Sequence, residues 1–199
     1  RPTKDWSHVN GVAYDPSDDT FVISARHLDI VFKMTRAGEL RWVLGTEDPA
    51  TTGDDGWPWL TLLSGRLPSQ MHDPRILDDG TLLLYDNGVA VGFSRAVAYT
   101  IDPGAMTAGQ DWEWIDPDWS PPLFGGYVGG VDALANGNVL IEHAGLGGFI
   151  LDPFHSTWIH LSEVDPNEGE KVFEATIHGS VGYMGYRVRH MESLYPPSP

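Results

Sequence analysis

The sequence predicts an all-β fold, and more narrowly a β-propeller, on three observations. Glycine and proline are abundant, with 23 and 15 copies in 199 residues, and they separate short apolar runs. Those runs alternate in hydrophobicity with a period of two, and no stretch has a convincing helical period. A strand–turn–strand pattern also recurs three times, with turns at residues 18–19, 79–80 and 136–137, about 60 residues apart. Short antiparallel sheets repeated along one chain are typical of propeller blades.

Each repeat is expected to form one blade. The first spans about residues 8–45, where an acidic turn precedes the alternating run TFVIS. The second spans about 72–115 and the third about 127–175; their DDGT and ANGN turns suit hairpins because Asp, Asn and Gly tolerate positive φ. Segment 181–194 is expected to add a closing strand. Propellers typically close with four to eight blades, so residues 1–199 are expected to be a single propeller domain or a propeller fragment.

The composition narrows the range of partners and chemistries. The formal net charge is −16, which disfavours binding to nucleic acid or to an anionic membrane. The chain has no cysteine, which excludes disulfides and thiolate chemistry, and no apolar run approaches the ~20 residues of a membrane span. It begins at Arg1-Pro2 without a methionine or a leader-like segment, and we expect a processed or truncated chain.

Two histidines occupy equivalent places in the repeats. His8 and His72 each come just before or at the first strand of a blade, and in a propeller these strand starts surround the central channel. Asn10 lies two residues beyond His8, on the same side of a strand, and Arg26 with His27 ends the second strand of the first repeat. This set favours recognition or transfer of an anionic group. The alternative is structural: hydrogen bonds to a neighbouring blade for His8, and an ion pair with a turn carboxylate for Arg26.

Other site types have little support, and we expect no metal and no cofactor. The chain has no HxH or HExxH spacing, no GxSxG elbow and no glycine-rich loop leading into a helix. The remaining histidines lack a partner pattern and are expected to be structural: His143, His155, His160, His178 and His190.

Several blocks of the sequence resemble the arylsulfotransferases that work without an adenosine phosphosulfate cofactor. They are DWSHVNGVAYDPSDDTFVISARH, IVFKMTRAGELRWVLG, QMHDPRILDDGTLLLYDNG, SRAVAYTID and the terminal YRVRHMESLYP, which together extend from Asp5 to Tyr195. The resemblance implies a six-bladed propeller located in the periplasm or outside the cell. It also implies transfer of a sulfuryl group from an aryl sulfate to a phenol through a sulfated histidine.

The resemblance assigns roles residue by residue. The QMH block makes His72 the nucleophile, while His8, Asn10 and Arg26 are donors to the sulfuryl oxygens. The full set of residues expected to bind substrate beside these catalytic groups is Asn10, His27, Gln70, Asn87 and Arg95.

Three departures from the family pattern stand out. Family members carry a further active-site histidine upstream of the DW-x-H-x-N block, in a stretch that this chain does not contain. Glycines 129–130 stand where a hydroxyl residue is expected, and Met71 is inserted between Gln70 and His72.

Three functions therefore compete. The first is an arylsulfate sulfotransferase acting on a small phenolic sulfate donor and a phenol acceptor; the second is an aryl sulfate hydrolase. The third is a non-catalytic propeller that binds a partner through aromatic loops. Those loops contain Trp57, Trp59, Trp112, Trp119 and Phe124. For every one of these functions we expect either a homo-oligomer or further blades, because exposed sheet edges promote aggregation.

Overall fold

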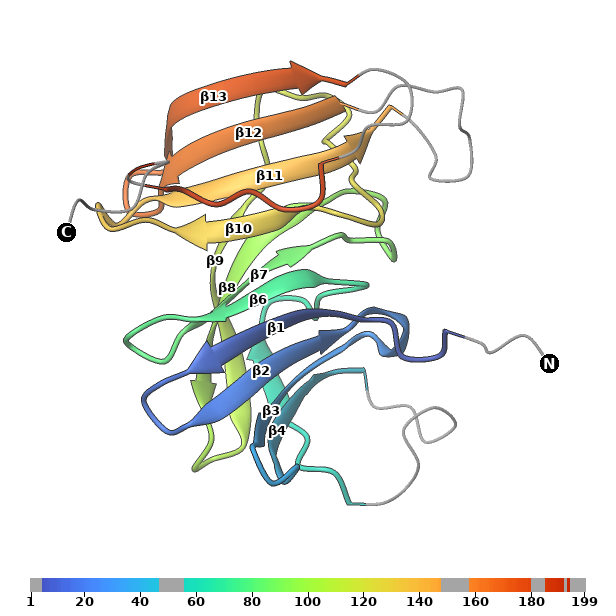
Figure 1. The fold of residues 1–199 in the computed structure, drawn as a ribbon, viewed down its shortest axis with the longest axis vertical. Coiled ribbons are helices and arrows are strands. Elements are labelled where there is room, and N and C mark those ends of the chain that lie inside the picture. The colour runs from blue at the N-terminus through green and yellow to red at the C-terminus, as the bar shows by residue number, and fades with distance from the viewer. Residues whose placement is uncertain (1–4, 47–55, 148–157, 180–184, 192, 194–199) are drawn as a thin grey trace.

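The computed structural model describes residues 5–46, 56–147, 158–179, 185–191 and 193. Within them the chain is all-β, as predicted, with three antiparallel sheets that we call blades 1, 2 and 3 (Figure 1). Blade 1 contains β1 (Val9–Asp15), β2 (Thr20–Ala25), β3 (Ile30–Thr35) and β4 (Leu40–Gly45). Blade 2 contains β6 (His72–Ile76), β7 (Leu82–Asp86), β8 (Arg95–Asp102) and β9 (Thr107–Trp114), and β5 (Thr61–Ser64) pairs in parallel with β9. Blade 3 contains β10 (Gly130–Ala133), β11 (Val139–Leu146), β12 (Trp158–Asp165) and β13 (Glu170–His178).

The three predicted turns join the first two strands of each blade. Gly80 and Gly137 both have positive φ, at 87° and 89°, and Asp19 does so at 56°. Side chains close two of the turns: the Asp79 carboxylate accepts a bond from the Thr81 N–H, and the Asn136 amide oxygen accepts one from Asn138. Turn chemistry therefore fixes where each strand pair reverses.

Blade 2 is covered on both faces, which explains its continuous apolar run TLLLY. On β7, Leu82 and Leu84 pack into the core shared with blade 1, whereas Leu83 and Tyr85 pack into the core shared with blade 3. Successive side chains of a strand point to opposite faces. A strand between two blades is therefore buried on both faces, and β7 is buried along its whole length, from Leu82 to the ion-paired Asp86.

The first strands of the blades lie beside one another, with β6 between β1 and β10 (Figure 1). We call the end of the sheets at which these strands begin the site end, and the opposite end, with the three hairpin turns, the turn end. The short 3₁₀ turn Arg26–Leu28 after β2 also lies at the site end, because β2 runs antiparallel to β1. In the described part of the chain, no helix has the length and apolarity that a membrane span requires.

Segment 181–194, which is expected to supply a closing strand, differs from that prediction where the structure describes it. Its described residues, 185–191 and 193, form no strand. They cross the inner strands instead of pairing along one of them. Arg187 donates to the Asn10 carbonyl on β1, Arg189 to Asp73 on β6, and the His190 N–H to Asp132 on β10. The segment is held by side-chain bonds to three strands rather than by a backbone ladder.

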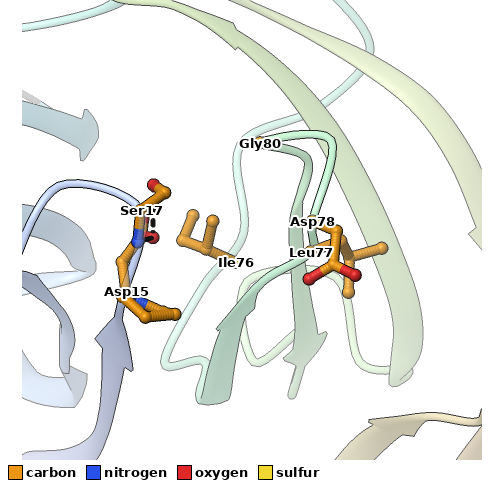
Figure 2. A pocket seen from close by; sticks show the side chains of 7 residues that line it. Asp15, Ser17, Ile76, Leu77, Asp78 and Gly80 are labelled. Carbon is orange, nitrogen blue, oxygen red and sulfur yellow. Dashed lines mark hydrogen bonds between the residues drawn. The ribbon is translucent and has the colours of Figure 1, made fainter.

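Both hollows described at the surface lie at the turn end. One, of about 240 Å³, lies between the turn at Asp15–Ser17 and the turn at Ile76–Gly80 (Figure 2). The other, of about 570 Å³, lies between blades 2 and 3 and includes Trp112 and Leu134 in its wall. Trp112, one of the aromatic residues expected in a binding module, lines the second hollow, and none of the expected catalytic or substrate-binding residues lines either one.

Candidate active site

His8, Arg26 and His72 come together at the site end through strand pairing. The Arg26 N–H donates to the His8 carbonyl at 3.0 Å, which places the start of β1 next to the end of β2. β6, which begins at His72, lies beside β1. The charges of Arg26 and His8 both act on His72 and lower its pKa. The structure therefore places these three residues at the same end of neighbouring strands.

Asn87 fixes the position and the tautomer of His72. The Asn87 side-chain amide donates to the carbonyls of Gly125 and Val128, at 2.5 and 3.0 Å. Carbonyls only accept hydrogen bonds, so the amide nitrogen must face them and Oδ1 must face His72. Oδ1 lies 2.7 Å from His72 Nδ1, which therefore carries the proton. The lone pair of the neutral ring is thereby placed on Nε2.

His72 Nε2 is buried and has no hydrogen-bond partner among the described residues. The side chain is only 1% exposed. Burial is the largest influence on this group and lowers the pKa of His72 to about 4, although the hydrogen bond that His72 donates to Asn87 acts in the opposite direction. At neutral pH the imidazole is therefore uncharged, and its Nε2 lone pair is unoccupied. Such a nitrogen is a competent nucleophile.

Arg26 also keeps an unoccupied donor. One of its terminal nitrogens donates to the Gly126 carbonyl at 2.9 Å, while its Nε is buried without a hydrogen-bond partner in the described structure. Burial lowers the pKa of Arg26, and the carboxylates of Asp29 and Asp5 oppose that shift. Arginine remains protonated in proteins at neutral pH. The site therefore contains a fixed cation with spare N–H capacity.

His8 is held by Asp5, a residue that the sequence did not single out. The His8 N–H donates to one carboxylate oxygen of Asp5 at 3.1 Å, and the other oxygen contacts His8 Nδ1. These contacts keep His8 in a left-handed backbone conformation, with φ at 46°. The pKa of Asp5 is lowered mainly by its hydrogen bond to His8. His27 lies against this pair, with its ring centroid 4.6 Å from that of His8 and Nδ1 2.6 Å from the Asp5 carbonyl.

Asn10 and Gln70 serve the framework in this structure. The Asn10 amide nitrogen donates to the Met71 carbonyl at 2.9 Å, and its oxygen accepts a bond from Ser24 at 2.6 Å. Asn10 thus ties β1 to β2 and to the start of β6. The Gln70 N–H donates to the Asp29 carboxylate at 2.5 Å, and its φ of 52° is that of a turn residue.

Arg95, which pairs with Asp86 across β7 and β8, is fully occupied. Its guanidinium has five N–H groups, and it makes five hydrogen bonds within blade 2. The acceptors are Asp86, Gln110, Glu113, the Arg66 carbonyl and the Tyr99 hydroxyl. No N–H of Arg95 is left to bind a substrate, so its role is to hold blade 2 together.

The glycines in place of the expected hydroxyl residue have a steric reason. A Cβ on Gly130 would lie 2.7 Å from an Asp73 carboxylate oxygen, and one on Gly129 would lie 2.4 Å from the Tyr85 ring. Gly129 also has φ at 125°, which disfavours any side chain. Blade 3 therefore contributes backbone, not a side chain, at this point of the channel.

The crossing segment supplies neighbours that the sequence did not reveal. The Tyr186 ring stands edge-on to His72 with their centroids 6.1 Å apart. Arg189 and Arg187 form ion pairs with the buried Asp73, which directly follows His72. The alternation in YRVRH is the only signal in the sequence, and it does not say which strands the arginines contact.

Comparisons with known proteins are consistent with this site. The statistical model of the family Arylsulfotransferase (ASST) matches residues 1–187. Two curated relatives named arylsulfate sulfotransferase AssT align over 140 residues, one from Escherichia coli at 30% identity and one from Lelliottia amnigena at 26%. These alignments cover 57% and 56% of this chain but only 23% of each relative.

Solved structures offer only weak similarity. Kuenenia stuttgartiensis hydrazine synthase matches with a TM-score of 0.42 at 11% identity, covering 88% of this chain and 51% of the other. A Bacteroides caccae protein of unknown function matches with a TM-score of 0.38 at 13% identity, covering 88% and 63%. The family match, in contrast, covers almost the whole sequence, and the chain belongs to the arylsulfotransferase family.

Proposed function

We propose that this chain carries the catalytic centre of an arylsulfate sulfotransferase, with His72 as the nucleophile. The observation that carries the proposal is the state of the His72 ring. The ring is neutral, and its protonated Nδ1 donates a hydrogen bond to Asn87. Its Nε2 is buried and has no hydrogen-bond partner among the described residues. Burial without a partner costs free energy. A substrate atom that meets Nε2 would offset that cost.

The first half-reaction forms an N–S bond and breaks an S–O bond. Nε2 of His72 attacks the sulfur of the aryl sulfate, and the phenolate leaves with the S–O electron pair and is protonated by water. The second half-reaction reverses this order. The oxygen of an acceptor phenol attacks the sulfur, the N–S pair returns to Nε2, and the phenol proton passes to water. The imidazole is regenerated, and no oxidant or reductant is needed.

Arg26 and His8 are proposed to stabilise the charge on the sulfuryl oxygens. Sulfuryl transfer resembles phosphoryl transfer, in which charge spreads over three peripheral oxygens and catalysis depends on positioning and electrostatics. The Nε of Arg26, which is buried without a hydrogen-bond partner among the described residues, is proposed to donate to such an oxygen. Asp5 holds His8 in position. Asn10 and Arg95 have no such part in the proposal, since their polar groups are occupied.

The proposed substrates are a small aryl sulfate donor and a phenol acceptor, and the proposed location is the periplasm or the cell exterior. Both rest on family resemblance. The two relatives, from Escherichia coli and Lelliottia amnigena, are named arylsulfate sulfotransferases.

The test uses p-nitrophenyl sulfate with and without an added phenol. We expect release of p-nitrophenol that depends on the phenol, together with a sulfo adduct on His72 detected by mass spectrometry in the absence of acceptor. His178→Ala, which changes an exposed histidine on β13, is the matched control and should retain the adduct.

The alternative functions predict different results. Release of sulfate to water at the same rate with and without phenol would identify a hydrolase. A folded chain with neither turnover nor adduct would overturn the enzymatic proposal and favour a binding module.

A further inference from the structure

Asp5, His8 and His27 form a compact group of metal-ligating side chains at the rim of the candidate site. One ligand atom from each residue lies within 4.8 Å of the other two. Asp5 and His27 are exposed and His8 is partly exposed, so an ion from solvent can reach all three. His8 lies just before β1, and His27 lies in the 3₁₀ turn after β2. The group therefore has none of the short spacings by which histidine metal sites are recognised in a sequence.

The group is held by the fold and not by the side chains alone. The Arg26 N–H donates to the His8 carbonyl, and the His27 N–H donates to the Ser7 carbonyl at 3.2 Å. These backbone bonds fix the two histidines relative to each other. The Asp5 carboxylate accepts a bond from the His8 N–H, and its backbone carbonyl lies 2.6 Å from His27 Nδ1.

The donor set selects one class of ion. Two imidazoles and one carboxylate suit borderline divalent metals such as Zn²⁺, with ligand distances near 2.0–2.2 Å. Mg²⁺ and Ca²⁺ prefer a site built of oxygens. The net charge of −16 also attracts cations to this surface.

We propose that Asp5, His8 and His27 bind one Zn²⁺ ion, which links the segment before β1 to the 3₁₀ turn after β2. Water completes the coordination. The proposal is independent of the sulfuryl-transfer reaction. Because His8 also belongs to the proposed sulfuryl site, binding and not turnover is the measurement that decides it.

The experiment titrates the full chain, first stripped with EDTA and exchanged into metal-free buffer. Isothermal titration with ZnCl₂ should give one ion per chain with a dissociation constant in the micromolar range, and MgCl₂ should give no heat of binding. Co²⁺ should produce visible ligand-field bands that Zn²⁺ removes. Saturating Zn²⁺ should raise the melting temperature, because it binds the folded chain.

Two variants and a control locate the site. Asp5→Asn and His27→Ala should each weaken Zn²⁺ binding at least about tenfold, or about 1.4 kcal/mol. His178→Ala, which removes an exposed histidine outside the group, should bind as the wild type does. Circular dichroism confirms folding, and the altered side chains are exposed. Absence of saturable binding below about 100 µM Zn²⁺, or wild-type affinity in both variants, would overturn the proposal.

Discussion

The polar groups around Arg95 and those around His72 are both buried, but they differ in how completely their hydrogen bonds are made. Arg95 uses all five of its N–H groups within blade 2. His72 and Arg26 each keep a buried nitrogen without a hydrogen-bond partner in the described structure. Buried polar groups are almost always paired, and exceptions gather at functional sites. The incompletely paired cluster is therefore the better candidate for binding a substrate, which would supply the missing partners.

His143 shows that an unpaired nitrogen is not sufficient. It is fully buried on β11, burial lowers its pKa to about 4, and its Nε2 also lacks a hydrogen-bond partner among the described residues. Its Nδ1 lies 2.9 Å from the Tyr85 hydroxyl. The charges that act on it come from His160, Asp116 and Lys171, and no arginine is among them. The charge of Arg26, which acts on His72, is what distinguishes His72 from this structural histidine.

The largest difference between the two buried histidines should appear when His72 and His143 are replaced one at a time. His72→Ala should lower turnover of p-nitrophenyl sulfate by at least about a thousandfold, because the nucleophile is lost. His143→Ala should lower the free energy of unfolding while turnover per folded molecule stays within a few-fold of wild type. Steady-state kinetics and thermal melts of both variants make the comparison. Equal losses of turnover in the two variants would contradict the assignment of His72.

The fold was predictable because its signals are local. Asp79-Gly80 and Asn136-Gly137 carry their own turn chemistry. The sequence prediction takes the TLLLY run as alternating, but β7 is buried on both faces because a blade packs against each of them.

Parts of the site depend on partners far away in the sequence. The Asn10 amide bonds to the Met71 carbonyl, and Asp73 pairs with Arg189. A polar residue in a matching block can bind either substrate or framework. Neighbouring strands decide between these roles, and a single sequence does not display them.

Replacing one arginine from each cluster, Arg26 or Arg95, tests the same comparison. Arg26→Ala should reduce turnover about a hundredfold or more, the usual effect of removing one donor to a developing charge, with a small effect on stability. Arg95→Met should instead cost about 3 kcal/mol in the free energy of unfolding, because the buried Asp86 would keep only its longer ion pair with Arg66, at 3.4 Å. Urea unfolding and kinetics on the same samples separate the two effects. A stability loss in Arg26→Ala as large as that in Arg95→Met would remove the distinction.

Acid should act on the buried histidines through stability. In the folded chain the pKa of His143 is about 4, below its ordinary value of 6.5, so the unfolded chain binds a proton that the folded chain does not. The contribution of His143 is fully present above pH 6.5 and falls as the pH drops towards 4. His143→Gln should make the loss of unfolding free energy between pH 7 and 4 smaller by up to about 3 kcal/mol. Urea titrations at several pH values measure it, and an unchanged slope would contradict the burial of a neutral His143.

The smallest expected effect concerns how Asn87 sets the charge state of His72. Burial lowers the pKa of His72 to about 4, so the acid limb of the kcat/KM profile should lie near pH 4 in the wild type. Asn87→Asp would place a carboxylate against Nδ1–H, favour the charged imidazole and move that limb up by about one pH unit or more. The second carboxylate oxygen would face the carbonyls of Gly125 and Val128, so stability should fall as well.

If Asn87 only held the loop in place, Asn87→Asp would lower stability without moving the pH profile. The pH profile is therefore the decisive measurement. The ¹⁵N chemical shifts of His72 give a second one, because the wild type should show a protonated Nδ1 and a bare Nε2 at neutral pH. A profile unchanged by Asn87→Asp, together with a lower melting temperature, would make Asn87 a framework residue of the same kind as Arg95. A shifted profile would mean that Asn87 controls the proton on His72 Nδ1. The two clusters would then differ because this proton leaves Nε2 free to attack sulfur.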